Sequence, residues 1–105
     1  MAQKNILTYS KKKKALLLAQ NNRFAEAKAL YSQICQIDKT DADAWFSLGV
    51  INGKLENVSE AIDSFHKTIS LRPDHALAYY NLGMALRGHG EPEEAVKALR
   101  EAARL

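Results

Sequence analysis

The stretch AWFSLGVINGKLENVSEA at residues 44–61 is repeated in outline by AYYNLGMALRGHGEPEEA at residues 78–95. In both stretches an aromatic residue precedes Leu-Gly by three positions, and a polar segment then leads to Glu-Ala. The spacing is 34 residues, which also relates Phe65 to Leu99 and, one step earlier, to Tyr31. The sequence therefore contains an internal repeat. Its three units, called repeats 1, 2 and 3, cover residues of about 8–41, 42–75 and 76–105.

Each repeat has the hydrophobic spacing of two amphipathic helices. In repeat 2, Trp45, Leu48 and Gly49 follow the i, i+3, i+4 spacing of one helix face. Ala61 and Phe65 follow the i, i+4 spacing of a second. The chain has only two Pro and five Gly, so helix propensity is high along most of its length. We therefore expect an all-α fold of six helices. Their predicted bounds are residues 3–21, 24–37, 42–55, 58–71, 76–88 and 92–105.

Polar residues mark the predicted helix starts. Asn57 with Glu60 three residues later has the spacing of a capping box, and Pro92 suits the first turn of a helix. Thr40 and Asp74 are expected to start the first helices of repeats 2 and 3.

Small residues stand in the middle of the predicted helices. A glycine at such a position costs about 1 kcal/mol relative to alanine. Gly49 with Ala61, and Gly83 with Ala95, would put a minimal side chain on each helix of a pair. We expect these residues to let the two backbones cross closely.

This pattern resembles the tetratricopeptide repeat (TPR) family over nearly the whole chain after about residue 8. The matching residues are Trp45, Leu48, Gly49, Ala61, Phe65 and Pro73 in repeat 2, and Tyr79, Leu82, Gly83, Ala95, Leu99 and Ala102 in repeat 3. The resemblance implies a single domain over residues 1–105 in which three helix-turn-helix repeats stack into a right-handed α-α superhelix. Stacking is needed because one helix pair cannot bury its apolar face alone.

The two ends of the array depart from the family pattern. Lys11 and Lys14 occupy positions that are aromatic or leucine in the other repeats, as suits a polar N-terminal cap. At the other end the sequence stops within the last helix, and the face bearing Leu82, Leu86 and Leu99 is expected to be partly bare. This favours either self-association through that face or a chain that is the N-terminal part of a longer protein.

The sequence has no recognisable catalytic, cofactor-binding or metal-binding constellation. His66, His75 and His89 are not at metal-ligand spacing with one another or with Cys35. Cys35 lies in an apolar helix stripe, where a packed thiol is expected rather than a nucleophile. We therefore expect no enzyme, no cofactor and no metal.

A single cysteine and the absence of a long apolar run indicate the cellular setting. One cysteine cannot form an internal disulfide, which fits a reducing compartment. The longest apolar run, residues 15–19, is far shorter than the roughly 20 residues needed to cross a bilayer. We predict a cytoplasmic protein with no membrane partner.

Positive charge is concentrated near the N-terminus. The net charge is +3, and residues 1–35 contain seven Lys or Arg but one acidic residue. The four consecutive lysines at residues 11–14 point to different sides of a helix. They fit a solvated cap, an acidic protein partner or nucleic acid. Nucleic acid is the least favoured, because no aromatic residue interleaves with the lysines to stack bases; it would predict affinity that falls steeply with salt.

The TPR resemblance implies that the first helices of the repeats line a concave groove that binds peptide. The residues expected to bind the partner are Tyr9, Lys12, Lys13, Leu16, Phe46, Ser47, Val50, Lys54, Leu77, Tyr80, Asn81, Met84 and Arg87, with Gln20 and Asp43 beside them.

Four of these residues support a groove independently, because they are large and apolar but lie off the core stripe. They are Phe46, Val50, Tyr80 and Met84. They belong either to the contact between repeats or to an open apolar floor. An open floor ringed by basic residues would suit a partner with hydrophobic anchors and acidic flanks.

Two groove types known in the family match poorly. The clamp for chaperone C-terminal carboxylates would use the positions of Lys12, Leu16, Ser47, Leu77 and Asn81, and only Lys12 fits. The asparagine ladder of O-linked N-acetylglucosamine transferase-like arrays is matched only at Asn81.

We therefore predict a non-catalytic protein-protein interaction module or scaffold. The alternative is the N-terminal TPR segment of a multidomain transferase, similar to a glycosyltransferase or a sulfotransferase, whose repeats position substrate. A reading frame that continues beyond residue 105 would favour the alternative.

Overall fold

The computed structural model describes the backbone of residues 2–105 and the side chains of residues 6–105. Within these residues the chain forms six helices and no strand. The helices are α1 (Ala2–Gln20), α2 (Phe24–Ile37), α3 (Ala42–Lys54), α4 (Val58–Leu71), α5 (Ala76–Gly88) and α6 (Pro92–Arg104). Each predicted bound lies within one residue of the observed bound. The expected all-α fold is confirmed.

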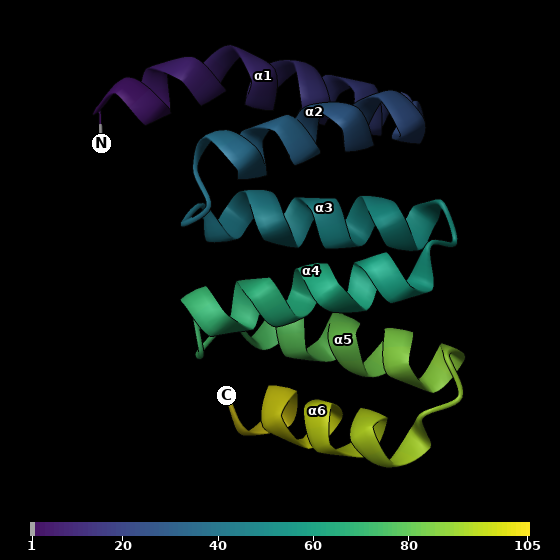
Figure 1. The fold of residues 1–105 in the computed structure, drawn as a ribbon. Coiled ribbons are helices and arrows are strands. Elements are labelled where there is room, and N and C mark those ends of the chain that lie inside the picture. Colours follow the sequence, from purple (N-terminus) through teal and green to yellow (C-terminus); the bar gives the residue numbers. More distant parts are fainter. Residues whose placement is uncertain (1) are drawn as a thin grey trace.

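Successive helices run antiparallel and stack from α1 at one end of the molecule to α6 at the other (Figure 1). The two ends of the chain consequently lie at opposite ends of the stack, and the molecule measures 40 × 28 × 18 Å. This elongated shape is expected when each helix pair contacts only its neighbours.

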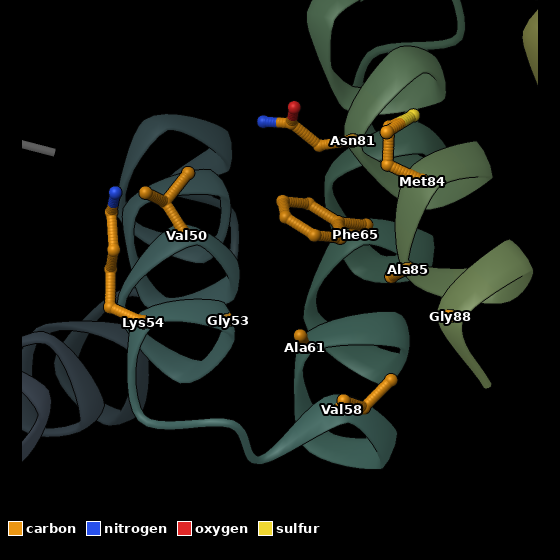
Figure 2. A pocket seen from close by; sticks show the side chains of 10 residues that line it. All are labelled: Val50, Gly53, Lys54, Val58, Ala61, Phe65, Asn81, Met84, Ala85 and Gly88. Atoms are coloured by element: carbon orange, nitrogen blue, oxygen red, sulfur yellow. The ribbon is translucent and has the colours of Figure 1, made fainter.

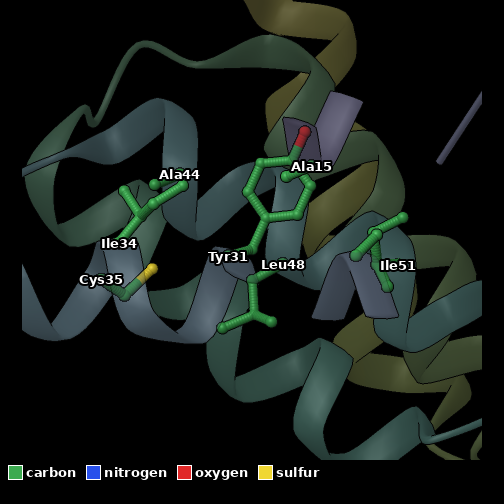
Figure 3. Close-up of a cluster of buried hydrophobic side chains, with 8 residues drawn as sticks. Ala15, Tyr31, Ile34, Cys35, Ala44, Leu48 and Ile51 are labelled. Carbon is green, nitrogen blue, oxygen red and sulfur yellow. The ribbon is translucent and has the colours of Figure 1, made fainter. Parts of the chain in front are cut away.

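Two clusters of buried side chains form the core. The first joins α1, α2 and α3 and consists of Ala15, Ala27, Tyr31, Ile34, Cys35, Ala44, Leu48 and Ile51 (Figure 3). The second joins α4, α5 and α6 and consists of Ala61, Ile62, Phe65, Leu82, Leu86, Ala95 and Ala98. Each cluster combines helices of two successive repeats, so burial in one repeat depends on its neighbour.

Cys35 belongs to the first cluster and is only 2% exposed. Burial of the thiol, with a smaller contribution from the negative charge of Asp41, raises the pKa of Cys35 to about 12. Since the thiolate is the nucleophile, this thiol is unreactive at neutral pH. The prediction of a packed thiol is confirmed.

The turns inside the three repeats share one backbone conformation. Asn22, Glu56 and Gly90 each have a positive φ, of 61°, 62° and 81°. They are spaced by 34 residues, although their side chains have nothing in common. At the end of α3, the N–H of Glu56 donates to the carbonyl of Gly53 at 3.1 Å, and that of Asn57 donates to Asn52 at 2.8 Å. This pair of bonds defines a Schellman motif, and both bonds recur after α1 and α5.

Replacing Glu56 with glycine is expected to raise the free energy of unfolding by about 1 kcal/mol. A left-handed backbone is unfavourable for a residue with a Cβ, and glycine removes that cost. Urea denaturation followed by far-UV circular dichroism measures the change. Gly90→Ala at the equivalent turn is the matched control and should lower stability by a similar amount. A loss of stability in Glu56→Gly would contradict the proposed strain.

The N-caps of α3 and α5 each lie one residue after the predicted position. Asp41, rather than Thr40, accepts a bond from the N–H of Ala44 at 3.1 Å. His75, rather than Asp74, accepts a bond from the N–H of Ala78 through Nδ1, also at 3.1 Å. Asn57 does precede α4, but its side chain makes no capping bond.

Candidate peptide-binding surface

A pocket of about 440 Å³ lies between the first helices of repeats 2 and 3, and we call it the α3–α5 pocket. Figure 2 shows Val50 and Lys54 on one wall, Asn81 and Met84 on the opposite wall, and the ring of Phe65 between them. Its remaining lining residues are Gly53, Val58, Ala61, Ala85 and Gly88. The pocket is therefore mainly apolar, with a lysine and an amide at its edges.

Phe65 forms the floor of this pocket because a glycine leaves room for its ring. A Cβ added at Gly49 would lie only 2.6 Å from Phe65 Cε1. The ring also packs against Phe46, with centroids 5.8 Å apart and planes tilted by 53°. The mid-helix glycine of α3 thus allows an aromatic side chain from α4 to lie against α3.

An equivalent pocket, the α1–α3 pocket, lies one repeat earlier. It has a volume of about 260 Å³ and is lined by Lys12, Leu16, Tyr31, Asp43, Ala44 and Ser47. Leu16, Tyr31 and Ser47 correspond, at a spacing of 34 residues, to residues that line the α3–α5 pocket. The fold therefore repeats one pocket geometry along its first helices.

Three lysines of α1 contact other side chains of the molecule. Lys12 Nζ lies 2.5 Å from Asp41 Oδ2, and Lys11 Nζ donates to Gln33 Oε1 at 2.8 Å. Lys13 Nζ lies 5.5 Å from the centroid of the Tyr9 ring. Of these three lysines, only Lys12 is paired with a negative charge, whereas Lys11 and Lys13 contact neutral groups.

Two basic residues lie near the α3–α5 pocket, away from the lysines of α1. Lys54 and Arg87 are exposed in the last turns of α3 and α5, and neither forms an ion pair with another of residues 6–105. Asp43, by contrast, faces Arg72 at 3.4 Å. The α3–α5 pocket therefore has two basic residues beside it that form no ion pair within residues 6–105.

The two pockets bring together about half of the residues predicted to bind a partner. Val50, Lys54, Asn81 and Met84 line the α3–α5 pocket, and Lys12, Leu16 and Ser47 line the α1–α3 pocket. The others line neither of the two, and they are Tyr9, Lys13, Phe46, Leu77, Tyr80 and Arg87.

Two of the four apolar residues that supported a groove are partly covered. Phe46 and Val50 are half-buried and pack against the second core cluster. Phe46 also faces His75, with ring centroids 4.8 Å apart. Tyr80 and Met84 are exposed, at 49% and 36%. The apolar surface open to a partner is therefore formed more by α5 than by α3.

Sequence reasoning missed the contribution of the second helices. Val58, Ala61 and Phe65 from α4 line the α3–α5 pocket, and Tyr31 from α2 lines the α1–α3 pocket. The repeat itself carried a signal for them, because Tyr31 and Phe65 are aromatic residues at equivalent positions.

Two further features bear on the class of function. Among the described side chains, no three His, Cys, Asp or Glu residues gather where they could hold one metal ion. No helix among residues 2–105 has the length and apolar character needed to cross a membrane.

The family model described as "Tetratricopeptide repeat" matches residues 12–65 and again residues 53–105. Among curated proteins, the chain is 35% identical over 86 residues to the tetratricopeptide repeat-containing protein trd-1 of Caenorhabditis elegans, covering 82% of this chain and 11% of that protein. It is 30% identical over 76 residues to the human protein O-mannosyl-transferase TMTC3, covering 71% and 8%. It is 36% identical over 79 residues to the peroxisomal targeting signal receptor of Komagataella phaffii, covering 74% and 14%. The chain thus spans between 8% and 14% of the length of these relatives.

Solved structures share the superhelical fold. A structure of MamA superposes with a TM-score of 0.89 at 24% identity, covering 93% of this chain and 54% of that one. The type III secretion chaperone SycD of Yersinia enterocolitica, in complex with a peptide of the translocator YopD, superposes with a TM-score of 0.89 at 19% identity, covering 91% and 73%. The expected stack of helix pairs is therefore the fold of the chain.

Proposed function

Because the chain belongs to the tetratricopeptide repeat family, we propose that it is a non-catalytic interaction module that binds a peptide segment of a partner protein along its first helices. The structural neighbour SycD, which was solved with a peptide of YopD, supports peptide binding by this fold. The α3–α5 pocket is the proposed centre of the site.

The observation that carries the proposal is an apolar pocket with unpaired positive charge beside it. Met84 and Phe65 offer an apolar wall and floor. Lys54 lies at the edge of the same pocket, and Arg87 lies nearby on α5. Binding energy is usually concentrated in a buried apolar anchor, whereas surrounding charges select the partner and speed association. The proposed ligand therefore has a hydrophobic side chain next to an Asp or Glu.

Selection of peptides from a random displayed library tests the proposal. Enriched peptides are expected to share an apolar residue adjacent to an acidic one. Lys54→Glu should weaken their binding by roughly tenfold, because it places like charges together. Met84→Ala should weaken it severalfold through the loss of apolar contact while the fold is kept. Fluorescence polarisation measures the Kd, and circular dichroism monitors the fold.

Lys14→Glu is the matched control, since it changes the net charge equally at an exposed position that lines neither pocket. It should leave the Kd nearly unchanged. Equal weakening by Lys14→Glu and Lys54→Glu would show that binding follows total charge rather than the pocket. Unfolding of Met84→Ala would mean that this residue is a core residue.

The proposed setting is the cytoplasm. A lone cysteine that remains a buried thiol supports a reducing compartment. A protein partner is favoured over nucleic acid because no aromatic residue interleaves with the lysines at 11–14 to stack bases. We expect peptide affinity to change modestly with salt.

A second candidate function rests on the similarity to TMTC3, a protein O-mannosyl-transferase. In that case the repeats would position the substrate of a catalytic domain in the same chain. The discriminating observation is the gene: an open reading frame that runs from these repeats into a transferase domain would favour this candidate.

A further inference from the structure

A second groove, of about 650 Å³, is formed by the second helices of repeats 2 and 3 together with α5. We call it the α4–α6 groove, and Figure 1 shows its three helices in succession along the stack. Its floor consists of buried apolar residues from all three helices, namely Ile62, Leu82, Leu86 and Ala98. The groove shares no residue with the α3–α5 pocket. A partner in this groove would therefore leave the proposed peptide site free.

The edge of the α4–α6 groove is acidic. One lysine, Lys97, lies at this edge beside four carboxylates, which are those of Asp63, Glu91, Glu94 and Glu101. Glu94 pairs with Lys97, and Glu101 pairs with Arg104. Both pairs join successive turns of α6, where such pairs are weak. Asp63 and Glu91 form no ion pair with another of residues 6–105. The groove thus carries net negative charge with His66 neutral, on a chain whose net charge is +3.

The equivalent place one repeat earlier, between α2 and α4, is occupied by two lysines of the chain itself. Lys67 Nζ lies 5.8 Å from the centroid of the Trp45 ring. Lys28 Nζ lies 2.8 Å from Glu60 Oε2 and so joins α2 to α4. Both are favourable contacts of an ammonium group, one with an aromatic face and one with a carboxylate. An aromatic residue and an acid at these two positions therefore hold cations.

Repeat 3 keeps the aromatic residue and the acid but not the lysines. At a spacing of 34 residues the aromatic residue is Tyr79 and the acid is Glu94. The two lysines are replaced by Ile62 and Glu101. All four of these residues line the α4–α6 groove. The groove therefore presents the same two positions without the two lysines that occupy them one repeat earlier, and with one further carboxylate.

The earlier repeat also shows that this side of the array stays open when another repeat follows. Repeat 3 follows α4 directly, and α5 packs on α4. The side chain of Glu60 is nevertheless 58% exposed, and Lys67 is exposed. The α4–α6 groove is consequently expected to be accessible whether or not further repeats follow α6.

We propose that the α4–α6 groove binds a basic segment of a partner protein. One Lys or Arg side chain of the partner lies over Tyr79, as Lys67 lies over Trp45, and a second faces Asp63 and Glu91. An apolar side chain between the two cations contacts the floor. The surface is separate from the α3–α5 pocket, whose proposed ligand has the opposite charge.

The length of the groove sets the spacing of the two cations. Tyr79 is near the start of α5 and Glu101 is near the end of α6, so they lie at the same end of this antiparallel pair. Glu91 precedes α6 at the other end. The ten residues from Glu91 to Glu101 rise by about 15 Å along a helix. An extended peptide covers this distance with about four or five residues.

Fluorescence polarisation with a labelled probe peptide tests the proposal, with the chain titrated to about 1 mM so that weak binding is visible. The probe has two arginines about four residues apart and a leucine midway between them. We expect saturable binding, and at least tenfold weaker binding of the same peptide with serines in place of the arginines. The net charge of the chain repels the arginine peptide, so its preferential binding reports a local acidic surface.

Glu101→Lys should raise the Kd of the arginine peptide by about tenfold or more. It installs the lysine of the equivalent position in repeat 2, so the chain fills the place over Tyr79 itself. Asp63→Asn should raise the Kd about threefold. Asp74→Asn is the matched control, because it makes the same change at an exposed position outside the groove, and it should leave the Kd unchanged.

Failure of the arginine peptide to bind would overturn the proposal. So would equal weakening by Asp63→Asn and Asp74→Asn, or unchanged binding by a Glu101→Lys chain that circular dichroism shows to be folded. Self-association of the chain that both the peptide and Lys14→Glu reduce would show that a second copy, rather than a partner protein, occupies the groove. Met84→Ala should not alter binding of the arginine peptide, so this test and that of the α3–α5 pocket can fail separately.

Discussion

Replacing Gly83 with leucine is expected to lower the free energy of unfolding by about 3 kcal/mol. A Cβ at this position would lie 2.6 Å from Leu99 Cγ and 3.2 Å from the carbonyl oxygen of Ala95. Leu99 can change rotamer, but the carbonyl belongs to the backbone of α6, so α5 and α6 must move apart. The better helix propensity of leucine returns only about 1 kcal/mol. Urea denaturation monitored by circular dichroism measures the difference.

Gly53 supplies the control for this substitution. It is also a helical glycine, but a Cβ there would meet nothing within 4 Å outside its own helix. Gly53→Ala is therefore expected to stabilise the protein slightly, by up to about 1 kcal/mol, through helix propensity. If Gly83→Leu denatured at the same urea concentration as the wild type, the close crossing of α5 and α6 would not be a steric requirement.

The 34-residue repeat explains why the helices could be predicted from the sequence. Gly49 and Gly83 occupy equivalent positions of repeats 2 and 3, and each faces a large apolar residue, Phe65 or Leu99. The repeated pattern therefore predicts the packing of the helices as well as their bounds. The left-handed turn at Glu56 is not predicted by its residue type, because glutamate is not typical of that conformation. Only its spacing from Asn22 and Gly90 marks it.

The N-caps show a limit of local reasoning. Thr40 and Asp41 are both good capping residues, and their side chains cannot be ranked without the backbone geometry. His75 is not among the usual N-cap residues, so the sequence favours Asp74, the residue before it. In the structure the second residue of each pair caps the helix.

The binding surface was predictable only in part, because it depends on neighbours that a position in the repeat does not reveal. Val50 and Met84 are equivalent in sequence, yet Val50 is half-buried by the next repeat and Met84 is exposed. Lys12 was expected at a groove, and it does line one, but it also pairs with Asp41 at the start of α3. That contact joins residues 29 positions apart, and no helical spacing predicts it.

Phe65→Ala is expected to lower the free energy of unfolding by about 3–5 kcal/mol, which is typical of a buried phenylalanine. The side chain is 4% exposed, packs against Phe46 and belongs to the core cluster that joins α4, α5 and α6. Its loss leaves a cavity, and the contact between repeats 2 and 3 weakens. The same denaturation experiment measures the effect, and a change below about 1 kcal/mol would show that the helices collapse around the missing ring.

Phe65→Leu separates the two roles that the structure gives to this ring. Leucine is the residue at the equivalent position of repeat 3, where it also lies against a glycine. It should keep most of the apolar contact, and the stability loss should stay within about 1.5 kcal/mol. The α3–α5 pocket would nevertheless lose its flat aromatic floor, so peptides selected on the wild type should bind more weakly to a chain that remains folded. Unchanged binding in Phe65→Leu would restrict Phe65 to the core and leave Met84 and Lys54 to define the pocket.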